Sequence, residues 1–189
     1  MGVVLLVGLL LAIVIGAGYL AGIYNQLVQV KVNVDKSWAN IEVLEKQRFD
    51  EIPKLVKVCE GYMQYERETL QRIIEARSRF LQAKGPTDMA QASADAGGAL
   101  KSLFALAEAY PELKANQNFT QLQQRVSALE NDIADRREFY NESVTLNNTR
   151  IQQVPYVFLA GSLAMTPREM YKVHASEKAS PEIQFALPR

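Results

Sequence analysis

The sequence contains few of the residues from which enzyme and metal sites are usually built. In 189 residues it has one cysteine and one histidine. A single cysteine excludes a disulfide within the chain and any zinc site made of several thiolates. A single histidine, His174, removes most histidine-based catalysis and metal binding. The GxGxxG, Walker A, HExxH and GxSxG patterns are also missing, so we predict no catalytic residue, no metal and no cofactor.

The chain also lacks an excess of either charge. Lys plus Arg and Asp plus Glu both number 21. Proteins that bind nucleic acid usually present a basic face, so this balance argues against a nucleic-acid partner. Apolar residues make up 48% of the sequence and charged residues 22%, which is typical of a folded chain.

Alternating apolar patterns and Asn-Gly or Asp-Gly hairpin turns are missing as well, so no sheet is predicted. Apolar residues instead recur at steps of three and four, which indicates helices. We predict a first helix that runs without a break to about Lys46 and turns or kinks near Asp50, because Pro53 removes a backbone donor. Three more helices are predicted over residues 55–81, 87–109 and 118–153, the last capped by Asn118.

The first residues form one long apolar run. No charged side chain precedes Lys31, and residues 2–23 are almost entirely apolar. About 20 such residues are needed to cross a bilayer. A cleaved signal peptide is the alternative, but it would need a charged first region and a shorter apolar core. We predict a retained anchor over residues 1–23, and Lys31 and Lys36 favour a cytoplasmic position for the residues that follow.

Small residues recur four positions apart within this run: Gly8, Ala12 and Gly16, and again Gly18 and Gly22. This spacing lets two helices approach closely in lipid, although glycine is also common in transmembrane helices in general. We predict that this face packs against a second copy of the chain, which would make the protein a homo-oligomer.

Four polar residues interrupt the apolar stripes of the predicted helices: Glu66, Arg77, Arg136 and Asn147. A buried charge needs a partner, so we predict a structural polar network in which Glu66 pairs with Arg77 or Arg136. The alternative is a small anionic ligand or a metal bound at the same network. Metal-binding bundles use Glu-x-x-His pairs, and no predicted helix here carries a histidine. Cys59 lies on an apolar stripe and is predicted to be a buried, unreactive thiol.

The four predicted helices favour an all-α fold, a single-pass transmembrane helix followed by an antiparallel four-helix up-and-down bundle. In that fold the chain returns to the bilayer at residues 155–165, which carry no charge but are too short to span. This segment lies either at the lipid interface or at the base of the bundle. The candidates for lipid contact are Tyr156, Phe158 and Leu159. Beyond Thr166 we expect a loosely ordered tail, with Ile183 and Phe185 as docking residues.

Several motifs resemble the LemA family of bacterial membrane proteins. Residues 23–28 resemble the family's YNxLV segment, and residues 48–56 are similar to R-x-DLIPNLV, with Lys54 where Asn is usual. Gly61-Tyr62 and Glu66 are similar to GYA-x-HE. The remaining matches are Val34, Ser37-Trp38, Ile41, Ala76-Arg77, the segment 110–115, and a run from Glu130 to Asn147.

The resemblance implies a helical bundle behind a membrane helix, and it does not imply an enzyme. We therefore predict a bacterial cytoplasmic (inner) membrane protein with an anchor at 1–23, a LemA-like bundle at 24–155, and an apolar juxtamembrane segment with an extended tail at 156–189. Its predicted role is a non-enzymatic scaffold or interaction module. Its predicted partners are the lipid bilayer, copies of itself and other membrane proteins, in envelope maintenance or protein quality control.

Overall fold

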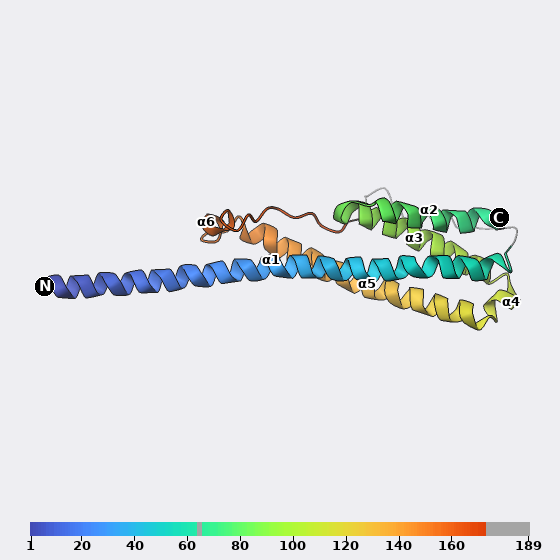
Figure 1. The fold of residues 1–189 in the computed structure, drawn as a ribbon, viewed down its shortest axis with the longest axis horizontal. Helices are drawn as coiled ribbons and strands as arrows, with labels where there is room; N and C mark the ends of the chain where they lie inside the picture. Colours follow the sequence, from blue (N-terminus) through green and yellow to red (C-terminus); the bar gives the residue numbers. More distant parts are fainter. Residues whose placement is uncertain (64–65, 173–189) are drawn as a thin grey trace, which may run out of the picture. The chain divides into compact units, whose positions relative to one another are not determined.

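The computed structural model describes residues 1–63 and 66–172. Within these ranges every regular element is a helix and there is no strand, which confirms the all-α prediction for this part of the chain. His174, Ile183 and Phe185 lie outside the described residues. Figure 1 shows the helices in chain order: α1 (Gly2–Glu60), α2 (Arg67–Gln82), α3 (Gly85–Ala107), α4 (Pro111–Lys114), α5 (Gln117–Arg150) and α6 (Val157–Ala160).

The chain divides into two compact units, and α1 and α5 contribute to both. Unit 1 consists of residues 1–46 and 131–170, and unit 2 consists of residues 47–130 together with the residues from 171 onward. Each unit has its own buried residues, so the two are described in turn.

In unit 1, α1 is exposed on all sides over residues 2–22, and one stripe of the helix is buried from Ile23 onward. Its buried positions then follow steps of three, four and seven residues, which keep one stripe of a helix covered. On α5 the buried side chains include Ile133, Tyr140 and Val144. The rings of Trp38 and Tyr140 lie 5.3 Å apart between centroids, in a tilted arrangement.

Unit 2 holds a larger apolar core. Its buried side chains come from five helices: Ile52, Leu55 and Cys59 from α1, Ile73 and Ala76 from α2, Leu100 and Leu103 from α3, Leu113 from α4, and Phe119 and Val126 from α5. α2 packs against α3, and the rings of Phe49 and Phe80 stack at 4.0 Å. α3 also buries small side chains, among them Ala90 and Ala96.

The predicted end of the first helix at about Lys46 is wrong. The helix continues through Pro53 to Glu60. A proline inside a helix removes one backbone hydrogen bond and leaves the carbonyl four residues earlier without its donor. Here that carbonyl belongs to Phe49, and the guanidinium Nε of Arg77 donates to it at 3.2 Å. The lost bond is thus replaced by a side chain from α2.

The helix predicted over residues 55–81 is divided in two. Its first part, to Glu60, is the end of α1, and α2 begins only at Arg67. The turn after Glu60 is marked by backbone bonds from Tyr62 and Met63 to the carbonyl of Cys59. Tyr62 and Met63 follow Gly61, a residue with low helix propensity. The periodicity continued across this turn because both parts bury their apolar stripe in the same core.

The start of α5 also differs from its prediction. Asn116, and not Asn118, is the capping residue, since its Oδ1 accepts from the backbone N–H of Asn118 at 2.9 Å and of Phe119 at 3.2 Å. Both asparagines suit a cap. The position of the buried Phe119 decides between them, because the helix must begin early enough to turn that ring into the core of unit 2.

Candidate functional site

The first part of α1 presents an uncovered apolar surface. Large side chains such as Leu5 and Ile15 are 71% and 70% exposed, whereas Leu27 on the same helix is fully buried. Among the described residues, this is the one helix long and apolar enough to cross a membrane, by length and composition. A continuous exposed apolar surface on one helix is typical of a site that contacts lipid or another protein.

The predicted packing face lies on this surface. Gly8, Gly16, Gly18 and Gly22 are exposed, and a Cβ added to any of them would meet no atom within 4 Å. Ala12 is exposed as well. Within the described chain, this face is open to a partner helix.

The four polar residues of the predicted network do not contact one another among the described residues. In unit 2, Glu66 accepts from the hydroxyl of Tyr110 at 3.3 Å, and Arg77 donates to the carbonyl of Phe49. Burial and the neighbouring carboxylate of Glu66 raise the pKa of the Tyr110 hydroxyl. Within the described ranges, residues 1–63 and 66–172, no ion pair joins Glu66 to Arg77 or Arg136.

The other two members lie in unit 1. Arg136 is exposed, although the stripe had placed it on the inward face. Asn147 is buried, and its Nδ2 donates to the carbonyl of Thr166 at 3.0 Å and to Asn148. Glu66, Arg77 and Asn147 therefore each contact a different neighbour, and Arg136 faces solvent.

The buried charges that do form ion pairs escaped the sequence analysis. Glu45, Arg48 and Glu51 are at most 3% exposed. In unit 1, Glu45 pairs with Arg137 at 3.3 Å. Glu45, Arg48 and Glu51 are spaced three residues apart, which puts their charges on one face of α1. This three-residue spacing is visible in the sequence. The first helix was predicted to run only to about Lys46, however, so the three charged residues were not placed on one helix face.

In unit 2, Arg48 is held by three oxygens. Its guanidinium donates to the hydroxyl of Ser93 at 2.6 Å and to the carbonyl of the same residue at 3.3 Å. The carboxylate of Glu130 lies 3.8 Å away. A buried guanidinium needs several acceptors because it has five donors, and these contacts tie α1 to α3 and α5.

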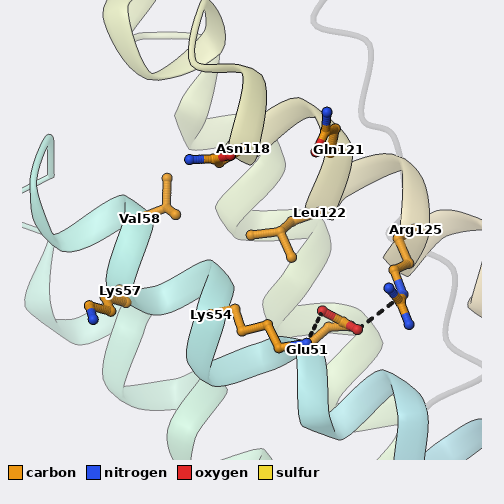
Figure 2. Close-up of a pocket in the computed structure, with 8 residues that line it drawn as sticks. All are labelled: Glu51, Lys54, Lys57, Val58, Asn118, Gln121, Leu122 and Arg125. Carbon is orange, nitrogen blue, oxygen red and sulfur yellow. Dashed lines mark hydrogen bonds and ion pairs between the residues drawn. The ribbon is translucent and has the colours of Figure 1, made fainter.

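Glu51 forms the centre of an open groove in unit 2. Its buried carboxylate accepts from Lys54 Nζ at 2.9 Å and from Arg125 Nε at 3.0 Å (Figure 2). The groove has a volume of about 430 Å³ and is lined by Glu51, Lys54, Lys57, Val58, Asn118, Gln121, Leu122 and Arg125. The lining thus holds three cationic side chains, one carboxylate and two amides, so the groove favours an anion over a cation.

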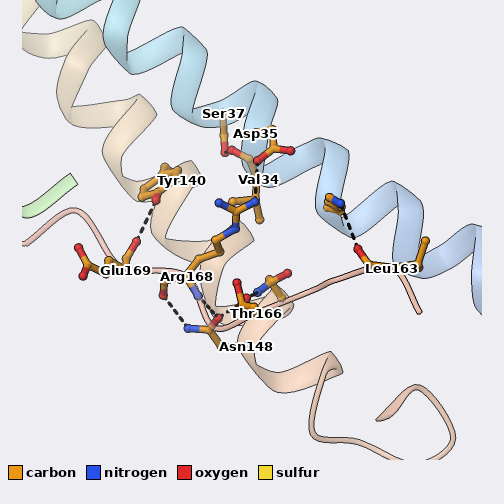
Figure 3. A network of polar contacts seen from close by, with 11 residues as sticks. Val34, Asp35, Ser37, Tyr140, Asn148, Leu163, Thr166, Arg168 and Glu169 are labelled. Atoms are coloured by element: carbon orange, nitrogen blue, oxygen red, sulfur yellow. Dashed lines mark hydrogen bonds and ion pairs between the residues drawn. The ribbon is translucent and has the colours of Figure 1, made fainter. Parts of the chain in front are cut away.

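Unit 1 contains a polar network of a different kind, in which side chains hold an extended segment. Residues 163–169 have few backbone partners of their own and lie along α1 and α5 (Figure 3). Asn148 Nδ2 donates to the carbonyl of Arg168 at 2.9 Å, and the N–H of Arg168 returns a bond to Asn148 at 2.8 Å. The side chain of Arg168 reaches Asp35 at 3.2 Å. We call residues 163–169 the strap.

Two further side chains hold the strap. Lys31 Nζ donates to the carbonyl of Leu163 at 3.1 Å, and the hydroxyl of Tyr140 donates to the carbonyl of Glu169 at 2.8 Å. Burial raises the pKa of Tyr140, with the positive charge of Arg168 acting against this shift and the carboxylates of Glu169 and Asp35 adding to it. The loose tail expected beyond Thr166 is therefore held closely as far as the described residues extend.

A second groove lies in unit 1 just beyond the exposed part of α1. The hydroxyl of Tyr156 donates to Gln26 Oε1 at 2.7 Å, and the guanidinium of Arg150 lies 4.4 Å from the centre of the Tyr156 ring. Of the three candidates for lipid contact, Phe158 is 75% exposed, while Tyr156 and Leu159 are half-buried. The groove has a volume of about 230 Å³.

Cys59 is fully buried in unit 2. Desolvation by burial raises its pKa to about 12, so the thiolate that would react or bind a metal is strongly disfavoured. Within the described residues, no group of three or more His, Cys, Asp or Glu side chains is placed to hold a metal ion.

Comparison with known proteins identifies the family. The model of the LemA family matches residues 37–185. Protein LemA of Metamycoplasma hominis is 28% identical over 131 residues, an alignment that covers 67% of this chain and 58% of the relative. The chain therefore spans less than two thirds of that relative's length. The predicted resemblance is confirmed, since the matched region covers most of the sequence, and the chain belongs to the LemA family.

Proposed function

We propose that this chain is a non-enzymatic, membrane-anchored helical scaffold that associates with copies of itself and with other membrane proteins. The observation that carries the proposal is the change in exposure along α1. Residues 2–22 of this helix are apolar and uncovered, and burial begins at Ile23. In a bilayer the exposed part would satisfy every backbone group within its own helix, and its side chains would face lipid.

The architecture proposed behind the anchor at 1–23 is an antiparallel four-helix up-and-down bundle over residues 24–155, with coiled-coil-like packing. Two contacts in unit 2 support it. Arg48 approaches Glu130, whereas Glu51 pairs with Arg125, so the residue numbers increase along α1 as they decrease along α5. Residues 156–189 would form the juxtamembrane segment and tail.

The proposed location is the bacterial cytoplasmic (inner) membrane, with the bundle in the cytoplasm. Lys31 and Lys36 follow the apolar run, as the positive-inside rule requires for that orientation. The proposed role is to hold partner proteins near the membrane, in envelope maintenance or protein quality control.

Extraction of membranes with alkaline carbonate tests the anchorage of the full chain. We expect the protein to stay in the membrane pellet and to begin at its first residues. A variant without residues 2–22 should move to the soluble fraction. Finding the full chain in the supernatant, or a mature form that begins near Gly18, would falsify the proposal.

Self-association is tested at the small-residue face. Gly8→Leu with Gly16→Leu should shift detergent-solubilised protein from an oligomer to a monomer in light scattering, because large side chains keep the helices apart. The matched control is Leu10→Met with Val14→Leu, at positions two residues after Gly8 and two residues before Gly16, and it should leave the oligomer intact. An equal effect of both pairs would contradict a role for this face.

The groove around Glu51 supports a second candidate function, the binding of a small anion. Lys54 and Arg125 are more than half exposed, and the buried carboxylate of Glu51 positions both. Inorganic phosphate or citrate should raise the unfolding temperature of the full chain, and Arg125→Gln should abolish the shift. Arg72→Gln removes one positive charge from an exposed position on α2, and it should leave the anion-induced shift in unfolding temperature unchanged. An anion shift that survives Arg125→Gln would rule out this groove.

A further inference from the structure

The groove of unit 1 beside Arg150 lies close to the end of the exposed apolar run. Its α1 residues begin at Gln26, and the uninterrupted run of exposed residues ends at Gly22, because Ile23 is the first buried residue. Four residues of helix advance about 6 Å. The headgroup layer on each side of a bilayer is about 5–7 Å thick. If the first 22 residues lie in lipid, as proposed above, the groove opens at the depth of the phospholipid headgroups.

The charge around this groove has one sign. Asp35 is the first acidic residue of the chain, and none occurs from Ser143 to Pro167. The cations in these two stretches are Lys31 and Arg150. Lys31 is engaged by the carbonyl of Leu163. Arg150 pairs with no carboxylate in the part of the chain that the structure describes, so its charge is available to an anion.

The guanidinium of Arg150 is also held in place. It lies 4.4 Å from the centre of the Tyr156 ring, an arrangement that attracts a cation to the ring face. Stacking on a ring leaves the N–H edges of the guanidinium open, and these edges match the oxygens of a phosphate. The hydroxyl of Tyr156 donates to Gln26 Oε1, which leaves the Gln26 amide nitrogen as a second donor lining the groove.

Two exposed apolar side chains lie close in sequence to Tyr156, one of the residues that line the groove. Val154 and Phe158 are 73% and 75% exposed, and they flank the half-buried Tyr156 in sequence. An interfacial tyrosine beside exposed apolar residues is typical of a segment at the boundary between headgroups and acyl chains. The groove thus combines donors for a phosphate with neighbours that suit the start of an acyl chain.

We propose that this groove binds the headgroup phosphate of an anionic phospholipid, with Arg150 as the main donor, and this inference rests on the membrane anchorage proposed above. A zwitterionic headgroup would bring an ammonium group beside its phosphate. The absence of any acidic residue in 1–34 and 143–167 gives that ammonium no carboxylate to pair with. An anionic lipid is therefore preferred.

The test uses the full chain in detergent, titrated with phosphatidylglycerol or with phosphatidylcholine of the same acyl chains, and counts bound lipid by native mass spectrometry. The wild-type protein should bind the anionic lipid about fivefold more tightly, the effect expected of one cation near a lipid surface. Arg150→Gln should bring the two affinities together. Arg72→Gln, with the same loss of charge on α2, should keep the preference.

Two more variants separate the geometry from the charge. Arg150→Lys keeps the charge without the planar fork and should retain only part of the preference. Tyr156→Leu keeps Arg150 but removes the ring that holds it, and it should weaken phosphatidylglycerol binding as well. Far-UV circular dichroism confirms that each variant folds. If Arg150→Gln misfolds, the Arg150→Lys and Tyr156→Leu variants decide, and full preference in both overturns the inference.

Free phosphate distinguishes the two sources of the same chemistry. Inorganic phosphate at a tenfold excess over lipid should leave phosphatidylglycerol bound, whereas displacement would show a site for a soluble anion and overturn the inference. Carbonate extraction separates this inference from the proposed anchorage. An embedded protein whose lipid preference survives Arg150→Gln overturns the headgroup site alone. A wild-type protein released by carbonate overturns the anchorage and the site together.

Discussion

The two units of this protein are stabilised by different means although they share α1 and α5. Unit 2 buries an apolar core built from five helices, with Phe49 stacked on Phe80. In unit 1, polar side chains of α1 and α5 hold the strap by its backbone carbonyls. Apolar burial is non-directional and adds up over area, whereas hydrogen bonds to a strap depend on a few donors. We therefore expect a substitution in the core of unit 2 to destabilise that whole unit, and a substitution at the strap to destabilise only part of unit 1.

The largest effect is expected from the core of unit 2. Phe119→Ala should lower the free energy of unfolding by about 3–5 kcal/mol, because it removes a buried ring and leaves a cavity. Phe139→Ala is the matched control on α5 in unit 1, where the ring is half exposed. Urea denaturation of both variants measures the difference. Equal midpoints would contradict the view that unit 2 depends on apolar burial.

The bond between Arg77 and Phe49 should contribute less. Arg77→Met should cost about 1–3 kcal/mol, because the carbonyl that Pro53 deprives of a donor loses its replacement. In a Pro53→Ala background the backbone N–H returns, so the same substitution should cost less. A double-mutant cycle measures this coupling. Additive costs would show that Arg77 does not act through that carbonyl.

The strap should respond locally. Asn147→Ala removes a donor to Thr166 and should raise the amide hydrogen-exchange rates of residues 163–169, with an effect of about 1–2 kcal/mol. Unit 2 should keep its protection. Thr149→Ala, an exposed neighbour, serves as the control. A uniform loss of protection in both units would mean that the strap and the core unfold together.

The smallest effect is a pH dependence. Burial raises the pKa of Cys59 from 9.0 to about 12, so the folded protein keeps the thiol proton to higher pH than the unfolded chain. The stability that this gives is full below pH 9 and is lost as the pH rises toward 12. Between pH 8 and 10 the free energy of unfolding should fall by about 1 kcal/mol.

Cys59→Ala removes the thiol, and its stability should change less over the same pH range than that of the wild type. Tyr140 adds a later decline in unit 1, because burial raises its pKa above 10.0. Urea denaturation at several pH values measures both. A wild-type curve that is flat from pH 8 to 10 would contradict the burial of this thiol.

The helical content and the exposed apolar run could be predicted because both are local properties. Steps of three and four residues indicate a helix wherever they occur, and Cys59 was correctly assigned to a buried stripe for the same reason. Local patterns failed at Pro53, where they indicated a break. The guanidinium that keeps α1 intact comes from 28 residues along the chain from the carbonyl it serves.

Local sequence patterns also could not predict which charged residues are buried. Arg136 and Glu51 both lie among helical residues, yet Arg136 is exposed and Glu51 is buried between Lys54 and Arg125. Burial of a charge is decided by whether partners on other helices can compensate its desolvation. Such partners are not visible in the spacing of one helix.

The helical character of the chain, the apolar run over residues 1–22 and the membership of the LemA family can all be read from the amino-acid sequence. The end of α1, the choice of buried charges and the side-chain contacts that hold residues 163–169 become visible only in the folded chain. The difference arises from the range of the interactions. Helix periodicity depends on neighbours a few residues apart, whereas the satisfaction of a carbonyl or a buried charge depends on atoms brought together by folding.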